Sequence, residues 1–233
     1  MEYFTVHSLQ DMEQPSSPID KFEFMTLEYG VLNRNELRQA AEQAARSFSD
    51  YEYFTNWFPE QEERARVVIS IIWHSYKTKF NRVHQLTAKL EGKIVATAEL
   101  YDPDYKDPSI LSYILHGWLN AYMTADIKRI NDWIAMDAAA GKPCHDYQKT
   151  GPGIWYLSSL CVDPAVQGIG LGTQLVDYYE NYIRERGGKQ VVLYTNSQKN
   201  LNFYLKRGYE LFDERAFEYN DRKMGSWSLK KVL

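Results

Sequence analysis

Cysteines and long apolar runs are scarce in this sequence. Its 233 residues include two cysteines, Cys144 and Cys161, which is too few for a disulfide framework. No run approaches the roughly 18 consecutive apolar residues that a membrane-spanning helix needs. Residues 1–10 lack the basic start and the apolar stretch of a signal peptide. We therefore expect a protein of the reducing cytoplasm that does not act at a membrane.

A strong charge of one sign is also missing. The chain has 27 Lys and Arg against 31 Asp and Glu, a net charge of −4. Such a balance offers no electrostatic reason to expect a nucleic acid as partner. The five histidines show no metal-ligating spacing such as H-E-x-x-H, so no metal site is expected. Hydrophobic residues make up 44%, which is enough for one packed domain.

Hydrophobic periodicity predicts how the first hundred residues are organised. Turn residues at 14–18 separate an N-terminal arm over 1–20 from a folded domain over 21–233. A period of 3.6 marks the helices and a period of 2 marks the strands. The expected elements are a strand over 22–27, helices over 33–49 and 60–80, and a hairpin of strands over 83–89 and 94–101.

The second half begins with a segment of different character. Residues 101–153 are expected to form a helical insertion, helical over 110–136 and ended by Gly141-Lys142-Pro143. After this segment, strands and helices are expected to alternate along the chain. They comprise strands over 155–162 and 191–194, helices over 173–186 and 199–206, and closing strands over 209–219 and 225–232. This order predicts a mixed α/β fold with a parallel crossover.

A glycine-rich loop, Gln167 to Gly172, lies between a strand and a helix. Free N–H groups and the positive end of a helix dipole bind phosphate, and glycines let the backbone approach closely. A P-loop reading fails because no lysine follows the loop. A dinucleotide reading weakens because the spacing differs and the next strand ends at Tyr194-Thr195-Asn196 without an acid. A turn that binds nothing is the plain alternative.

Three segments resemble the GNAT (GCN5-related N-acetyltransferase) family. Gln167-x-x-Gly170-x-Gly172 matches the family motif Q/R-x-x-G-x-G/A, which cradles the coenzyme A pyrophosphate. Leu160 to Pro164 resembles the preceding strand, and Asn200 to Tyr209 resembles the family's F-Y-x-K-x-G-F/Y element. Ser226 to Leu229 resembles its last strand. The resemblance is specific over about residues 155–230.

The resemblance implies both a fold and a co-substrate. The fold is a central mixed, mostly antiparallel sheet flanked by helices, in which the parallel strands at 155–162 and 191–194 splay apart. The co-substrate is acetyl-CoA. Matching positions imply that it is held by Leu160, Cys161, Val162, Gln167, Gly168, Ile169, Gly170, Leu171, Gly172, Thr173, Asn200 and Tyr204. The family's asparagine falls on Ser197 here, with Asn196 one residue away, so Asn200 is favoured as the polar contact.

The same resemblance suggests catalytic roles. Tyr204 matches the family's general acid, which protonates the departing thiol. Glu99 lies where the family often places a carboxylate base. Asp102 and Asp104 in the following loop, and His116 and His145 in the insertion, are the alternatives for the base. Cys161 is read as a buried thiol rather than a nucleophile, since no histidine pairs with it by spacing.

Several functional hypotheses follow from these residues. The first is acetyl-CoA-dependent N-acetylation of a small-molecule or peptide amine. The second is a non-catalytic acyl-CoA-binding or sensor module, and the third is a mononucleotide-binding enzyme. Trp118, Tyr122 and Trp133 in the insertion are candidates to line the acceptor pocket. The closing strands are candidates to pair two subunits in a homodimer.

Overall fold

The computed structural model describes residues 27–233. The predicted arm over 1–20 therefore lies outside the described residues, as does all but the last residue of the predicted strand over 22–27. The elements in chain order are β1 (Leu27–Val31), η1 (Arg34–Glu36), α2 (Leu37–Phe48), α3 (Glu52–Thr55), α4 (Gln61–Lys79), β2 (His84–Leu90), β3 (Lys93–Tyr101), α5 (Ile110–Leu115), η2 (Trp118–Met123), α6 (Ile127–Gln148), β4 (Ile154–Val162), η3 (Pro164–Val166), α7 (Leu171–Glu185), β5 (Gln190–Thr195), α8 (Gln198–Lys206), β6 (Glu210–Tyr219) and β7 (Arg222–Val232).

One seven-stranded sheet runs through the described residues in the order β1-β2-β3-β4-β5-β7-β6. All neighbouring strands are antiparallel except β4 and β5, which are parallel. This confirms the predicted mixed, mostly antiparallel sheet. β6 ends the sheet, so one edge of the closing pair is left without a neighbour within residues 27–233.

The parallel pair separates soon after it starts. β4 and β5 are paired only from Ile154 with Gln190 to Tyr156 with Val192. The pairing of β4 with β3 shifts register next to this point, because Glu99 faces Ser159 while Leu100 faces Leu157. Ser158 is therefore the extra residue of a β-bulge, and a bulge bends its strand and increases the local twist. β4 turns away from β5 at this position, and the predicted splay is confirmed.

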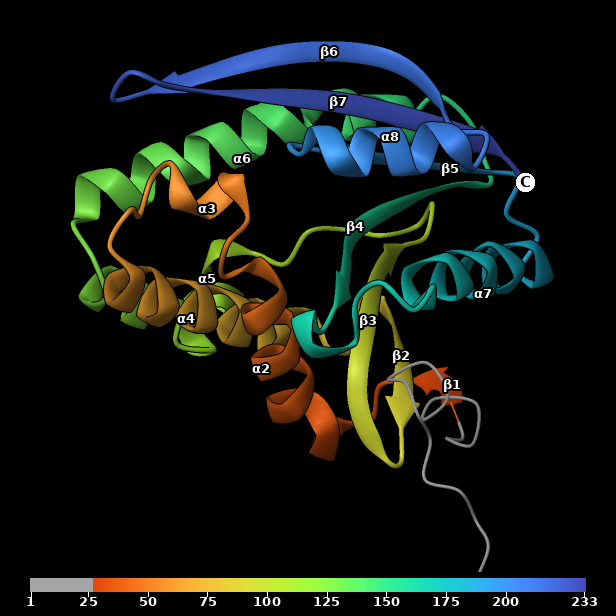
Figure 1. The fold of residues 1–233 in the computed structure, drawn as a ribbon, viewed down its shortest axis with the longest axis horizontal. Helices are drawn as coiled ribbons and strands as arrows, with labels where there is room; N and C mark the ends of the chain where they lie inside the picture. Colours follow the sequence, from red (N-terminus) through yellow and green to blue (C-terminus); the bar gives the residue numbers. More distant parts are fainter. Residues whose placement is uncertain (1–26) are drawn as a thin grey trace, which may run out of the picture.

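Two hydrophobic clusters cover the two faces of the sheet. Apolar side chains of α2, α3, α4 and α6 form the larger cluster, which includes Phe58, Val67 and Ile130. α7 and α8 cover the other face, with Leu175 and Tyr204 among the buried residues. Figure 1 shows α4 and α6 on one side of β4 and α7 on the opposite side. The separation of β4 and β5 therefore leaves an opening between two faces of the sheet that different helices cover.

Local signals account for most helix ends. The backbone N–H of Asn33 donates to Glu36 at 3.1 Å, part of a capping box at the start of η1 and α2. α7 ends at Glu185, where the N–H of Gly188 donates to the carbonyl of Ile183 at 3.0 Å, as the two glycines predict. The short helix α3 was not predicted, because its four residues carry no readable period.

The predicted helix stop at Gly141-Lys142-Pro143 is wrong, because α6 continues to Gln148. A proline inside a helix removes the hydrogen bond to the carbonyl four residues earlier. That carbonyl belongs to Ala139, and Arg215 Nη1 of β6 donates to it at 3.2 Å. The buried side chains of Ala140, Pro143 and Cys144 pack this part of α6 against the sheet. Tertiary contacts therefore outweigh the local stop signal.

This arrangement predicts a coupling between Arg215 and Pro143. Arg215→Met should destabilise the protein by about 1–3 kcal/mol, because the Ala139 carbonyl loses its donor. In a Pro143→Ala background the same change should cost about 1 kcal/mol less, since the alanine N–H restores the donor within the helix. Urea unfolding of the four proteins measures the coupling. Additive effects would show that Arg215 does not replace the missing helix bond.

Candidate functional site

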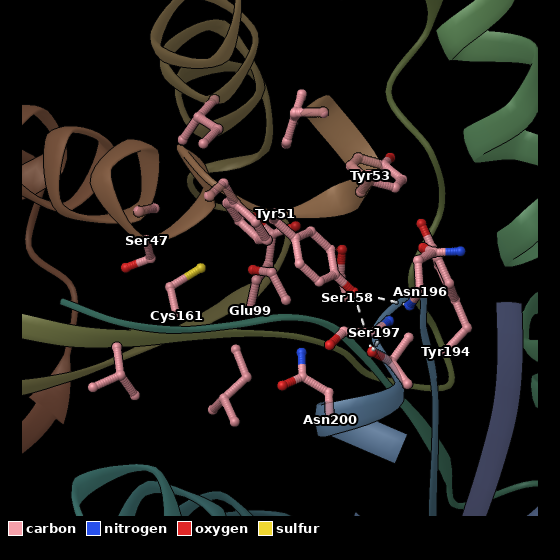
Figure 2. Close-up of a pocket in the computed structure, with 18 of the residues that line it drawn as sticks. Ser47, Tyr51, Tyr53, Glu99, Ser158, Cys161, Tyr194, Asn196, Ser197 and Asn200 are labelled. Atoms are coloured by element: carbon pink, nitrogen blue, oxygen red, sulfur yellow. Dashed lines mark hydrogen bonds between the residues drawn. The ribbon is translucent and has the colours of Figure 1, made fainter. Parts of the chain in front are cut away.

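A cleft of about 920 Å³ opens where β4 and β5 separate. Residues from both faces of the sheet line it: the end of α2, α3, α4 and α6 on one side, and the glycine loop and α8 on the other. Figure 2 shows the view along this cleft, with Glu99, Ser158 and Cys161 near the strands and Tyr53 near the helices. Two reactants can therefore enter from opposite faces and meet in the gap.

The glycine loop forms the wall next to α7. Gly168 and Gly170 have φ of +88° and +86°, a left-handed conformation that glycine adopts without strain. The first-turn N–H groups of α7 at Leu171, Gly172 and Thr173 have no partner within the helix and point out of its positive end. This geometry suits a pyrophosphate.

Side chains brace the loop from both ends. Arg46 at the end of α2 donates to Asp163 from Nε at 3.0 Å and from Nη2 at 2.7 Å. Gln167 Nε2 donates to the carbonyl of Val162 at 3.0 Å. Gln167 thus holds the loop against the end of β4 with its amide nitrogen. In the motif, Gln167 therefore positions the loop and the free N–H groups that follow it.

The structure brings the sequence-predicted site residues together with one exception. Those that line the cleft are Glu99, Leu160, Cys161, Val162, Gln167, Gly168, Gly170, Leu171, Gly172, Thr173, Asn200 and Tyr204. Ile169 packs instead against the core on the α7 side. An apolar side chain in a loop whose glycines face the cleft anchors the loop to that core.

The unpaired edge of β4 faces α8 across the cleft. Beyond Tyr156 no β5 residue pairs with β4, so backbone groups of Leu160 to Val162 on this side, apart from the Val162 carbonyl that Gln167 contacts, are available to a ligand. Burial, followed by the neighbouring Tyr51 and Cys161, raises the pKa of Tyr204, so its phenol is protonated at neutral pH. Burial also raises the pKa of the Cys161 thiol to about 12, which leaves it a poor nucleophile.

Tyr51 closes the far end of β5. Its hydroxyl accepts the N–H of Asn196 at 2.9 Å and lies 3.1 Å from Oγ1 of Thr195 (Figure 2). The Asn196 side chain is used elsewhere, since its Nδ2 donates to the carbonyl of Gly225 at 2.9 Å. Asn200 instead lines the cleft and approaches the Tyr51 hydroxyl. Of the two asparagines, Asn200 is the one whose side chain remains available to a ligand.

Glu99 is buried within a hydrogen-bonded network. Its Oε1 accepts from Lys79 Nζ at 3.2 Å and from the Tyr101 hydroxyl at 2.9 Å, and its Oε2 accepts from Gln85 at 3.1 Å. Burial raises the pKa of Glu99, but the Lys79 charge and these hydrogen bonds lower it more, so the net shift is downward. Glu99 is an ionised carboxylate at neutral pH.

A hydroxyl chain links Glu99 to the β-bulge. Ser158 Oγ donates to the Tyr101 hydroxyl at 3.2 Å, and that hydroxyl donates to Glu99. Lys79 Nζ also contacts the Tyr101 hydroxyl at 2.5 Å. Burial and the Glu99 charge raise the pKa of Tyr101, which keeps the phenol protonated as a link in the chain.

The alternative candidates for the general base lie mostly outside the cleft. Asp102 contacts His84 Nε2 at 3.0 Å outside the cleft, and Asp104 is exposed in a turn. His116 Nδ1 contacts the carbonyl of Ser112 at 2.7 Å, also away from the cleft. His145 alone among them lines the cleft, and burial lowers its pKa, so the imidazole is neutral at pH 7.

α6 contributes a stripe of residues to the opposite wall. Asp137, Gly141 and His145 follow at intervals of four and all line the cleft. Asp137 Oδ1 accepts from the hydroxyls of Tyr53 and Tyr194. Of the three aromatic residues predicted to line an acceptor pocket, Trp133 does so, whereas Trp118 and Tyr122 lie outside the cleft.

Sequence reasoning missed the residues that reach the cleft from distant segments. They are Arg46, Tyr51, Lys79, Tyr101, Asp137 and Ser158. Lys79 is at the end of a helix, where a cation looks like an ordinary response to the helix dipole. Ser158 lies in a strand in which apolar and polar residues show little alternation, and only the register shift against β3 reveals it as the bulge residue. No spacing rule joins such positions.

Among residues 27–233, no group of three or more His, Cys, Asp or Glu side chains is placed to hold a metal ion. No helix in this range is long and apolar enough to cross a bilayer.

Known proteins resemble this chain in sequence pattern and in fold. The family model described as "Acetyltransferase (GNAT) family" matches residues 45–209. Among curated proteins, no sequence matches significantly. Solved structures match along most of their length. The mosquito arylalkylamine N-acetyltransferase like 5b has a TM-score of 0.59 and 16% identity, covering 89% of this chain and 100% of its own.

Two other solved structures give the same picture. The Drosophila melanogaster polyamine N-acetyltransferase, an enzyme that forms N-acetylagmatine, has a TM-score of 0.53 and 17% identity over 89% of this chain and 100% of its own. The PaiA N-acetyltransferase of Thermoplasma acidophilum, in complex with coenzyme A, has a TM-score of 0.52 and 14% identity over 90% and 100%. At these identities the likeness concerns the fold.

The buried pair of Lys79 and Glu99 predicts a pH-dependent stability defect. Lys79→Met leaves the Glu99 carboxylate buried without its cation, so we expect a loss of roughly 3–5 kcal/mol at pH 7. A carboxylate whose folded pKa is lowered stabilises the fold above its unfolded pKa, and that contribution disappears as the pH falls. In the variant the pKa of Glu99 rises, so the difference from wild type should shrink below about pH 5.

Urea unfolding between pH 3 and 8 is the measurement. The matched control is Lys79→Met with Glu99→Gln, which removes both charges and should lose the pH dependence. A constant difference across this range would mean that Glu99 does not carry the defect.

Proposed function

The chain belongs to the GNAT acetyltransferase family, and on that premise we propose that it transfers an acetyl group from acetyl-CoA to the amine of a small molecule or peptide by direct attack on the thioester. The observation that carries this proposal is the cleft at the splay of β4 and β5. It combines free backbone N–H groups on one face with a buried acid and a proton-accepting network. The family uses acetyl-CoA, so the residues present must fit that molecule.

The coenzyme A side fits in charge and in hydrogen bonding. The N–H groups of Gly168 to Thr173 would hold the pyrophosphate at the positive end of α7. Lys199 of α8 also lines the cleft and supplies a positive charge. The open edge of β4 offers its backbone groups to an extended, amide-containing arm, as a neighbouring strand would. Asn200 supports the same arm from α8.

Acetyl-CoA supplies the thioester carbonyl that the amine attacks. Backbone N–H groups near Leu160 to Val162 would stabilise the negative charge that develops on the carbonyl oxygen. Tyr204 is protonated and buried, and its phenol would donate a proton to the sulfur as it leaves. Among residues 27–233 the Tyr204 hydroxyl forms no hydrogen bond, so its proton is free to turn toward the sulfur.

Proton removal from the amine falls to the network of Glu99. Both oxygens of Glu99 already accept hydrogen bonds, so Ser158 is the accessible end of the chain. Ser158 would accept the amine proton while its own proton moves to Tyr101 and that of Tyr101 moves to Glu99. The transfer becomes favourable as the C–N bond forms, because bonding to the carbonyl lowers the pKa of the nitrogen. His145 is the competing base, being neutral on the opposite wall.

Tyr204→Phe tests the proposed acid. We expect kcat to fall by about 10²- to 10⁴-fold, the range of general acid catalysis, with unchanged coenzyme A binding. Thiol release and mass spectrometry with an amine panel measure turnover, and calorimetry measures binding. Tyr147→Phe is a matched control, since its hydroxyl contacts Gln190 outside the cleft. Tight coenzyme A binding without turnover of any amine by the wild type would favour a sensor, and absent binding would reject both.

Ser158→Ala tests the proton chain. We expect kcat to fall by roughly 10- to 100-fold without a change in the KM for acetyl-CoA, because only the path to Glu99 is interrupted. Ser158→Thr keeps the hydroxyl and should restore most of the rate. If Ser158→Ala retains full activity while a His145→Gln variant loses it, the base is His145.

A further inference from the structure

Asp137 is a carboxylate of the cleft that the mechanism above does not use. It lies on α6, half-buried, and lines the cleft. Its Oδ1 accepts two hydrogen bonds, from Tyr53 of α3 and from Tyr194 of β5, the second at 2.6 Å. The carboxylate and its two donors come from three separate segments of the chain. The position of this carboxylate is therefore set by the fold and not by the local flexibility of one side chain.

Tyr53 and Tyr194 both reach Asp137 as hydrogen-bond donors. Burial raises the pKa of Tyr53 well above its ordinary value, and the Asp137 charge raises it further. Burial and Asp137 act on Tyr194 in the same way. Both phenols are therefore protonated donors at any physiological pH.

The second oxygen of Asp137 has no donor in the described chain. Among residues 27–233, no hydrogen bond reaches Oδ2, and no Lys or Arg nitrogen lies within 4.0 Å of this carboxylate. Two other charged side chains of the cleft do form ion pairs. Lys79 pairs with Glu99, and Arg46 pairs with Asp163. Asp137 is thus a built and oriented acceptor that keeps one oxygen and its full charge for a ligand.

The surroundings of Asp137 favour a cation. Tyr53, Trp133 and Tyr156 line the same wall, and aromatic faces attract cationic groups. Asp107 lies exposed at the cleft without an ion-pair partner in the described residues, so a second negative charge is present. Gly141, one turn after Asp137, contributes no side chain to the space. The pocket is therefore negative, aromatic and open next to the Oδ2 atom.

The nitrogen that attacks the thioester cannot be the cationic group that Asp137 binds. An amine attacks the carbonyl only after losing its proton, and an ion pair with Asp137 would raise its pKa and hold the proton. The reacting nitrogen must instead reach the β4 edge next to Ser158. We propose that Asp137 binds a second cationic group of the acceptor. The preferred substrate class is then a small diamine or a small alkylamine that carries a guanidinium group. This inference rests on the proposed acetyl transfer and names its substrate class.

Paired substrates give the test. Wild-type protein is assayed with 1,4-diaminobutane and with butylamine, which differ by the second ammonium group, and then with diamines of other lengths. We expect kcat/KM for the diamine to exceed that for butylamine by about 10- to 100-fold, as for a hydrogen bond between charged groups. Asp137→Asn should remove this preference, mainly through KM of the diamine, and leave butylamine within about threefold.

The controls distinguish binding of a cation at Asp137 from a general attraction of cations by the negative charge of the cleft. Asp107→Asn removes an exposed carboxylate of the same cleft and should change the diamine preference less than threefold. Thermal melting verifies that Asp137→Asn is folded, and Tyr194→Phe provides a second, milder variant that weakens the orientation of Asp137. That variant should lower the diamine preference in the same direction.

Distinct outcomes overturn the inference and the proposed function. If wild type acetylates butylamine as well as the diamine, or if Asp137→Asn lowers both substrates equally, Asp137 does not select a second cation. An equal loss together with a shifted pH profile would make Asp137 the base instead. If no amine of either kind is acetylated, the proposed function itself fails, whereas a preference retained in Asp137→Asn rejects only the inference.

Discussion

β4 and β5 remain paired for three residues, and the site depends on their separation at that point. A strand buried between neighbours would normally satisfy its backbone groups on both sides. The bulge at Ser158 bends β4 away, so that one side of the strand from Leu157 onward loses its partner within the sheet. Helices on the two faces close around the resulting gap without filling it. In the proposed function, the backbone groups that remain unpaired form the recognition surface for the co-substrate.

Charge within this gap is arranged in two opposite ways. Glu99 and Lys79 neutralise each other inside a network of hydrogen bonds, which tolerates burial and which continues through Tyr101 to Ser158 in the cleft. Asp137 is held by two neutral phenols that orient it without neutralising it. The first arrangement suits proton transfer at the strand edge. The second suits attraction of a positive group on the α6 side.

The glycine loop and the helix after it could be predicted because their chemistry is local. Gly168, Gly170 and Gly172 lie within five residues, and the free N–H groups belong to the same turn of α7. The continuation of α6 could not be predicted in this way. Gly141 and Pro143 are true local stop signals, and they are overcome by a hydrogen bond from Arg215, a residue more than seventy positions away. With the helix ended early, Asp137 and His145 would not have been placed on one face.

The sequence by itself determined the class of fold, the glycine loop and the positions of Tyr204 and Glu99, since periodicity and motif spacing act over short stretches of chain. Only the tertiary structure decided the partners of Glu99, the bulge at Ser158 and the pairing of Asp137 with Tyr53 and Tyr194. The physical reason is that the pKa of a group and the access of a ligand to it depend on burial and on neighbouring charges. Those neighbours come from α3, α4, α6 and β5, which a linear pattern cannot bring together.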